Sequence, residues 1–335
     1  MLAANALGFT PIVLAVVGVL FLVVSLSYAE GTAALPETGG AATFVRRAAN
    51  DLAGFMTGWA LFLDYLIVIA LSALFMPHYL AGALQVDALD KNPWDVVVAV
   101  GAIALVALVR VVRRPSLYSV GIVIPALDLL TQMLLVVLGF VFVFSPHALA
   151  HGTSLGSHPT WHALAFSLPL AMLAFTGLET VANLAEEARR PGVDLPRSVF
   201  AGIATVVTIY VAIAIVALSA FPGPKTELGD RWIRSPLVGV ASRIRGELPA
   251  WLGDVLRAYV GITGALILLV AVTTSISGFS RLAYSLGEHG QLPRSYGRLS
   301  RRAHVSPLAI ASVAIVSAAI VIATSFFRHD VQFLA

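Results

Sequence analysis

The chain has 335 residues, of which 59% are hydrophobic and 12% are charged, and its mean hydropathy is +0.90. These proportions exceed what a soluble domain of this size needs for its core, so they predict a polytopic membrane protein. The absence of cysteine excludes disulfides and thiolate metal sites. The net charge of +3 comes from basic residues in short loops, which is typical of membrane orientation rather than of nucleic-acid binding.

The apolar runs are predicted to be helices, because each crossing takes about 20 apolar residues and a backbone in lipid must satisfy its own hydrogen bonds. A porin-like barrel is excluded because the runs do not alternate. The fold class is therefore all-α, with a single transmembrane domain over residues 1–335 and about eight spans. The spans are predicted at 8–28, 54–84, 95–112, 117–145, 161–186, 198–221, 254–285 and 307–327.

The connection 222–253 mixes apolar and basic residues (DRWIRSPLVGVASRIRGELPAWLG). It is either a set of short amphipathic pieces along the membrane interface or a plain loop.

Basic residues alternate between connections, and most lie after the first, third, fifth and seventh spans. The positive-inside rule places those connections in the cytoplasm and both termini outside. The first apolar run is long enough to span and lacks the features of a signal peptide. An outside N-terminus without charge is unusual, and a missing preceding span would explain it. Arg113, Arg190 and Arg301 are thus predicted to face the cytoplasm, and Lys91, His151 and Trp232 to face outward.

Gly177 and Glu179 stand within an apolar run, in the stretch FTGLE. Glycine inside a helix costs about 1 kcal/mol relative to alanine, and an ionisable side chain in lipid costs several, so the stretch predicts an interrupted helix around a polar cavity. Such an interruption exposes N–H groups at one helix end and carbonyls at the other, which suit a carboxylate and an ammonium, and an amino acid carries both. The alternative is a glycine that allows close helix packing beside an interfacial Glu.

Three stretches carry a family resemblance. FTGLETVANLAEEARRPGVDLPRSV resembles the sixth-span signature of the amino acid, polyamine and organocation (APC) superfamily. LSYAEGTAALPETGGAATFVRRAANDLAGFMTGWALFLDYL resembles the end of its second span through its third, and SRLAYSLGEHGQLPRSYGRLSRRAHVSPLAI the end of its eighth through the start of its ninth. The stretches follow the order and spacing of the family and cover nearly the whole chain.

The resemblance implies a five-plus-five inverted repeat, in which the interrupted first and sixth spans face each other around the substrate. The predicted spans match the second to the ninth, so residues 1–145 would be the remainder of the first repeat and residues 161–335 most of the second. The first span and everything from the tenth on are missing from this pattern. We therefore expect the chain as given to insert into the membrane with impaired transport.

Substrate binding is predicted at the interruption, and coupling to a proton or cation at two other positions. Asp128 stands where several proton-coupled relatives carry a lysine in the fifth span; a buried carboxylate can itself bind a proton or a cation. An Asp capping an irregular turn after Pro125 is the alternative. Ser275 lies in VTTSISGFSR, whose small polar face either lines a cation site or packs between helices. The predicted substrate residues are Phe175, Thr176, Gly177, Leu178 and Glu179.

Histidines at four-residue spacing flank the outer loop, and on helices such pairs can ligate zinc. The loop holds no acid nearby, so a loop role is favoured over a metal site. The residues are His147, His151, His158 and His162.

The sequence thus predicts a secondary active transporter of amino acids or related amines in the cell membrane. It implies no cofactor and no nucleic acid; the partners are the small-molecule substrate, a coupling proton or cation and the lipid bilayer. The alternatives are a membrane fragment that transports nothing and a polytopic membrane enzyme. An enzyme is disfavoured because no nucleophile and base converge near one membrane face.

Overall fold

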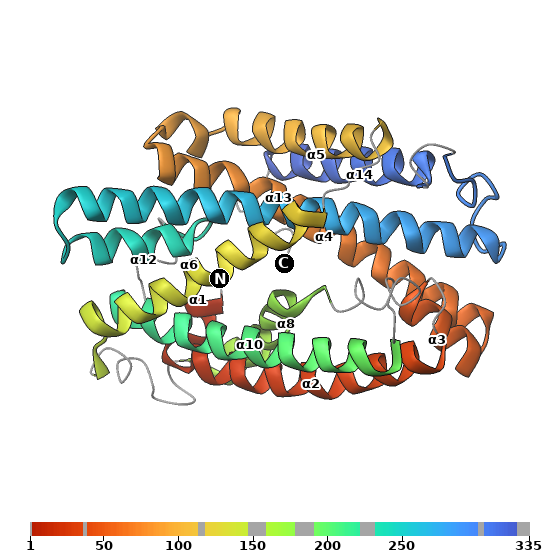
Figure 1. The fold of residues 1–335 in the computed structure, drawn as a ribbon, viewed down its shortest axis with the longest axis horizontal. Helices are drawn as coiled ribbons and strands as arrows, with labels where there is room; N and C mark the ends of the chain where they lie inside the picture. Colours follow the sequence, from red (N-terminus) through yellow and green to blue (C-terminus); the bar gives the residue numbers. More distant parts are fainter. Residues whose placement is uncertain are drawn as a thin grey trace.

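A computed structural model describes residues 2–35, 39–112, 118–146, 159–177, 191–221, 232–300 and 305–326. Within these ranges the regular structure is helical (Figure 1). Among the described residues, seven helices are long and apolar enough to cross a membrane, and Trp161–Phe175 forms a shorter apolar one. The prediction of an all-helical polytopic membrane protein is confirmed.

The helices follow the predicted apolar runs closely. The short α1 (Leu2–Ala6) and η1 (Leu7–Phe9) lead into α2, and η2 (Asp87–Asp90) and η3 (Leu173–Phe175) are single turns. The remaining helices are α2 (Thr10–Ala34), α3 (Gly40–Ala48), α4 (Asp51–Leu84), α5 (Trp94–Val112), α6 (Tyr118–Phe142), α8 (Trp161–Met172), α10 (Pro191–Ala220), α12 (Pro236–Arg245), α13 (Ala250–Glu288) and α14 (Pro307–Thr324).

Polar caps set the starts of several helices. The Asn50 side chain accepts a hydrogen bond of 2.8 Å from the Ala53 N–H at the start of α4. Thr160 caps α8 in the same way, and Ser306 caps α14 just before a proline in its first turn. Each cap satisfies an N–H group that the first helical turn leaves without a partner.

The first helix group consists of α4 and α13, packed against each other along their length, with α3, α5 and α14 around them (Figure 1). We call it the central group. Its core includes Tyr65, Ile69 and Leu74 of α4 and Ile276 and Leu282 of α13, all at most 1% exposed. Burial of such large apolar side chains on both helices stabilises this contact.

The second helix group consists of α2, α8 and α10, with α2 and α10 side by side (Figure 1). We call it the cavity group. Its smaller core includes Val13 and Val17 of α2, Ala171 of α8 and Ala214 of α10. Helix α6 contacts both α10 and α13 and so bridges the two groups.

Helix α12 is a short amphipathic piece, one of the two alternatives that the sequence leaves open for the connection 222–253. Val238, Val240 and Ile244 are buried, whereas Arg243 and Arg245 in the last turn are exposed. The plain-loop alternative is wrong for residues 236–245.

The candidate membrane span Arg197–Ala220 agrees with the predicted span 198–221. Its helix, α10, begins earlier, at Pro191, so part of the predicted link is helical; proline is tolerated in a first turn because its missing N–H has no helical partner there. Helix α6 runs without a break through Pro125 to Phe142. Asp128 therefore lies inside a helix and does not cap an irregular turn. The predicted orientation across the membrane stays a prediction.

Candidate functional site

The apolar helix α8 stops inside the predicted span. It passes into η3, which ends at Phe175, and Thr176 is extended with φ −63° and ψ 152°. Gly177 follows with φ +121°, a conformation that side chains with a Cβ rarely adopt. The prediction that the helix is interrupted near Gly177 is confirmed on the N-terminal side, where the helix ends at Phe175. Leu178 and Glu179, predicted to bind substrate, lie outside the described residues.

The end of α8 and η3 carries a partial negative charge, because the last carbonyls of a helix point beyond it. The Thr176 hydroxyl donates a hydrogen bond of 3.2 Å to the Leu173 carbonyl. The chain at this point thus combines backbone carbonyls, a hydroxyl and a glycine without steric bulk.

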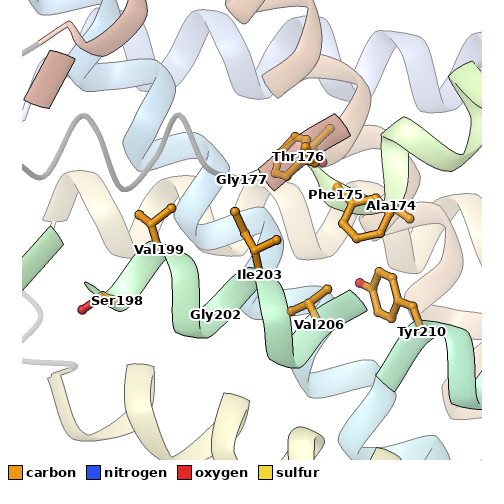
Figure 2. A pocket seen from close by; sticks show the side chains of 11 residues that line it. Ala174, Phe175, Thr176, Gly177, Ser198, Val199, Gly202, Ile203, Val206 and Tyr210 are labelled. Atoms are coloured by element: carbon orange, nitrogen blue, oxygen red, sulfur yellow. The ribbon is translucent and has the colours of Figure 1, made fainter. Parts of the chain in front are cut away.

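A cavity of about 300 Å³ lies against this helix end, between α2, η3 and α10 (Figure 2). We call it the first cavity. The rings of Phe175 and Tyr210 stand at one end of it, and Ser198 lies at the other. It is lined by Phe21, Ala174, Phe175, Thr176, Gly177, Ser198, Val199, Gly202, Ile203, Val206 and Tyr210.

Aromatic rings form a continuous wall of this cavity. The Phe175 ring centroid lies 5.7 Å from that of Phe21 and 5.5 Å from that of Tyr210, with tilted planes. Phe175 is only 5% exposed and belongs to the core of the cavity group. Of the predicted substrate residues, the structure places Phe175, Thr176 and Gly177 together on one cavity.

A second cavity of about 540 Å³ lies between α6, α10 and α13. Gly202, Val206 and Tyr210 line both cavities, so the two adjoin along α10. The remaining lining residues of this second cavity are Pro125, Ala126, Asp128, Leu129, Gln132, Ala201, Thr205, Ile209 and Ile267.

Among the described residues that line the second cavity, Asp128 is the one with an acidic side chain. It is 6% exposed, and its Oδ2 accepts a hydrogen bond of 2.6 Å from the Gln132 amide one turn along α6. The structure thus brings one of the two predicted coupling residues next to the predicted substrate residues, with Tyr210 between them.

Ser275 is buried in α13 but lines neither cavity. Its neighbourhood is a packing surface: a Cβ at Gly278 would lie 2.7 Å from the Tyr65 ring of α4, and Ser277 accepts a hydrogen bond from Arg110 of α5. The structure therefore does not bring Ser275 together with Asp128, and Ser277 and Gly278 of VTTSISGFSR contact neighbouring helices.

The sequence pattern does not single out Phe21, Gly202 or Tyr210, which all line the first cavity. Gly202 is a lone glycine within an apolar helix, a feature that can mark a site. Gly101 in α5 has the same feature but lines neither cavity, so the feature alone does not identify a cavity residue. Aromatic residues within apolar runs carry no signal at all, because core packing uses them in the same way.

His162 is the second residue of α8, while His147, His151 and His158 lie outside the described residues. Within the part of the chain that the structure describes, no three His, Cys, Asp or Glu residues gather as a metal site would require.

These helices and the cavity at a helix end define a polytopic α-helical membrane protein with a transporter-like fold. The whole chain, residues 1–335, matches the family described as "Amino acid permease". The chain belongs to this family, which confirms the resemblance to APC superfamily permeases and a multi-pass location in the plasma membrane.

Three curated relatives illustrate the similarity. The uncharacterized amino acid permease YecA of Bacillus subtilis is 26% identical, over 89% of this chain and 66% of that protein. The low-affinity putrescine importer PlaP of Escherichia coli is 24% identical (86% and 61%), and the branched-chain amino acid permease BcaP of B. subtilis is 22% identical (85% and 61%). The chain thus spans less than two thirds of the length of each of these relatives, and their names, all of transport proteins, point away from an enzyme.

Proposed function

We propose that the chain acts in secondary active transport of amino acids or related amines, and that it is not an enzyme. The observation that carries the proposal is the end of a membrane helix at Phe175 beside a cavity lined by Thr176 and Gly177. Supporting it, one relative is named for branched-chain amino acids and another for putrescine.

The chemistry of the first cavity suits a protonated amine. The negative end of the α8 dipole attracts an ammonium, and the backbone around Gly177 allows close approach because a glycine there has no side chain. The aromatic wall of Phe175 and Tyr210 adds cation–π attraction. Leu178 and Glu179 would continue the substrate site from the next residues of the chain.

Coupling to a proton or a cation is part of the proposal, with Asp128 and Ser275 as its residues. A carboxylate in a membrane interior is costly unless it is protonated or paired, which makes it a natural carrier of a mobile positive charge. Asp128 has the stronger support, since it lines the cavity that adjoins the first one.

We also propose the two-repeat organisation, with residues 1–145 in one repeat and residues 161–335 in the other. In such transporters the substrate lies at the interface of the repeats, and one helix bundle moves against the other. Each helix group combines helices of both proposed repeats, since α4 packs on α13 and α2 packs on α10.

The test is uptake into proteoliposomes with a panel of radiolabelled amino acids and amines, under a proton gradient, a sodium gradient and neither. We expect saturable, gradient-dependent uptake of at least one compound. The absence of both uptake and binding would overturn the proposal.

A further inference from the structure

A groove of about 310 Å³ lies on the central group, between α4, α13 and α14. We call it the outer groove, and it shares no described lining residue with the first or second cavity. Its floor is the buried Phe62 ring of α4, stacked on the Phe279 ring of α13 with centroids 4.4 Å apart. Trp59 and Val316 at its sides are 47% and 43% exposed. Because α4 and α14 are both of membrane-spanning length, the groove opens toward lipid.

The surface of the outer groove is apolar. No charged side chain is among the described residues that line it, and its polar side-chain groups are the Trp59 indole and the hydroxyls of Tyr296 and Ser312. The Ser312 hydroxyl donates a hydrogen bond of 2.9 Å to the Ala309 carbonyl of its own helix, so its proton is not available to a ligand. Such a surface suits a hydrocarbon chain and leaves a charged or strongly polar ligand without partners.

The outer groove begins at one membrane face and reaches the depth of one leaflet. Helices α4 and α14 start at the same face, because Gln291 in the connection before α14 donates a hydrogen bond of 2.9 Å to the Asp51 carbonyl at the start of α4. Trp59 and Val316 lie eight and nine residues into their helices, which is about 12 to 14 Å at 1.5 Å per residue. One leaflet contributes about 15 Å of hydrocarbon, so the groove matches the length of an acyl chain.

The mouth of the outer groove carries positive charge. Leu292 and Tyr296 of the connection between α13 and α14 line the groove, Arg294 lies between them, and Arg298 follows. Both arginines are exposed, and neither takes part in an ion pair with another described residue. The segment 289–300 contains no Asp or Glu. Arginines at a membrane surface attract anionic headgroups, and a guanidinium binds a phosphate with two parallel hydrogen bonds.

We propose that the outer groove binds an anionic phospholipid, with one acyl chain on the Phe62 and Phe279 rings and the phosphate on Arg294 and Arg298. The apolar groove alone would accept a chain of any lipid, and the arginines at its mouth select the anionic headgroup. The bound lipid would hold the connection between α13 and α14 against α4. This site is separate from the cavities of the proposed transport function and adds a lipid ligand to it.

Trp59 is the reporter for the experiment, because bromine atoms on an acyl chain quench the fluorescence of an indole that they touch. The 335-residue chain is reconstituted in phosphatidylcholine liposomes with increasing fractions of phosphatidylglycerol, and either lipid is the brominated one. The fluorescence that Trp59→Phe removes gives the contribution of Trp59. We expect Trp59 to prefer phosphatidylglycerol about tenfold. Trp161, which is 68% exposed and outside the groove, should show no preference when Trp161→Phe isolates it.

Two pairs of variants separate the headgroup from the acyl chain. The double variant Arg294→Gln, Arg298→Gln should abolish the preference for phosphatidylglycerol at Trp59, whereas Arg243→Gln, Arg245→Gln removes the same charge from α12 and should keep it. Val316→Phe fills the groove and should also abolish the preference. Its control is Ile315→Phe, at the neighbouring residue of α14, which is 69% exposed and does not line the groove. Equal helix content by circular dichroism checks the folding of each variant.

The inference is wrong if Trp59 shows no preference for phosphatidylglycerol, or if the preference survives in the double arginine variant or in Val316→Phe. Equal loss in the α12 variant would also overturn it, because the effect would then come from the overall charge of the protein. Glycerol 3-phosphate has the headgroup chemistry without an acyl chain; displacement of the lipid by it would assign the arginines to a free phosphate. Quenching of Trp59 that falls as the protein-to-lipid ratio rises would assign the groove to a second copy of the chain. Uptake in the transport assay judges the proposed function independently of these results.

Discussion

Glycines serve opposite purposes at the α4–α13 contact and along the first cavity. In the α4–α13 contact, a Cβ at Gly261 would lie 2.7 Å from the Tyr79 carbonyl oxygen, and one at Gly278 equally close to the Tyr65 ring. At Gly177 and Gly202 a Cβ would meet no atom within 4 Å. The first pair lets two helices approach closely, and the second pair leaves space.

The difference indicates where the molecule is built to be rigid and where it is built to hold something. The central group contains most of the largest fully buried side chains, such as Tyr65, Leu74 and Ile276. The cavity group has a core of fewer residues with a cavity beside it. Regions with fewer buried apolar contacts open at lower free energy, so we expect motion to concentrate in α8 and α10.

A buried polar cluster ties the connection before α12 to the central group. The His78 ring of α4 lies with Nδ1 2.9 Å from the Leu74 carbonyl, and a carbonyl can only accept, so Nδ1 carries the proton. The Nε2 atom then accepts from Arg234, whose Nη1 lies 2.7 Å away. Arg234 also pairs at 3.5 Å with Asp95, which is 4% exposed.

The largest effect is expected from Arg234→Met. Removal of the cation leaves Asp95 buried without its partner, which costs about 3 kcal/mol of unfolding free energy. The matched control is Arg245→Met, whose pair with Asp254 at 2.9 Å has both side chains about two-fifths exposed; exposed pairs contribute about 0.5 kcal/mol. Thermal unfolding in nanodiscs compares the two, and equal losses would contradict the role of Asp95 burial.

Gly278→Leu is expected to cause the second-largest loss of stability, because it forces side-chain atoms into the space of the buried Tyr65 ring. Overpacking of this kind costs about 2 kcal/mol. Gly101→Leu in α5, where a Cβ meets nothing within 4 Å, should change the unfolding temperature little. A similar drop for both variants would mean that the α4–α13 contact is not close-packed.

Gly177→Leu should have a smaller effect on stability and a large one on function. The positive φ of Gly177 costs a side chain about 1 to 2 kcal/mol, while the leucine occupies the first cavity. We expect loss of ligand binding and uptake by a protein that still inserts. Gly290→Leu shares the positive φ (+71°) and the open surroundings but lines neither cavity, so it should bind normally.

The sequence predicts the spans well because length and apolar content alone decide whether a helix crosses a membrane. The helix end at Gly177 is also predictable, since a glycine and a carboxylate in an apolar run are both costly. The position of Ser275 outside both cavities is not predictable, because VTTSISGFSR is the same pattern whether its small polar face meets a cavity or, as near Gly278, another helix. Tyr210 and Phe21 become site residues only through the packing of α2 on α10.

The smallest effect, and the sharpest test of the comparison, comes from one substitution made in both groups. Gly202→Ala adds a methyl group inside α10 where space is open, and alanine is better than glycine in a helix interior by about 1 kcal/mol, so the variant should be more stable than the parent.

Gly261→Ala gains the same helix propensity, but its methyl group meets the Tyr79 carbonyl oxygen, a backbone atom that cannot rotate away. The α4–α13 contact must then separate by a few tenths of an ångström along well-packed neighbours, so we expect a net loss of stability. Unfolding temperatures in nanodiscs of one lipid composition give the sign of each change. A higher unfolding temperature for Gly202→Ala and a lower one for Gly261→Ala would support the distinction between glycines that leave space and glycines that allow helix contact. A higher unfolding temperature for Gly261→Ala would contradict it, because α4 and α13 would then accommodate the added methyl group without loss of stability.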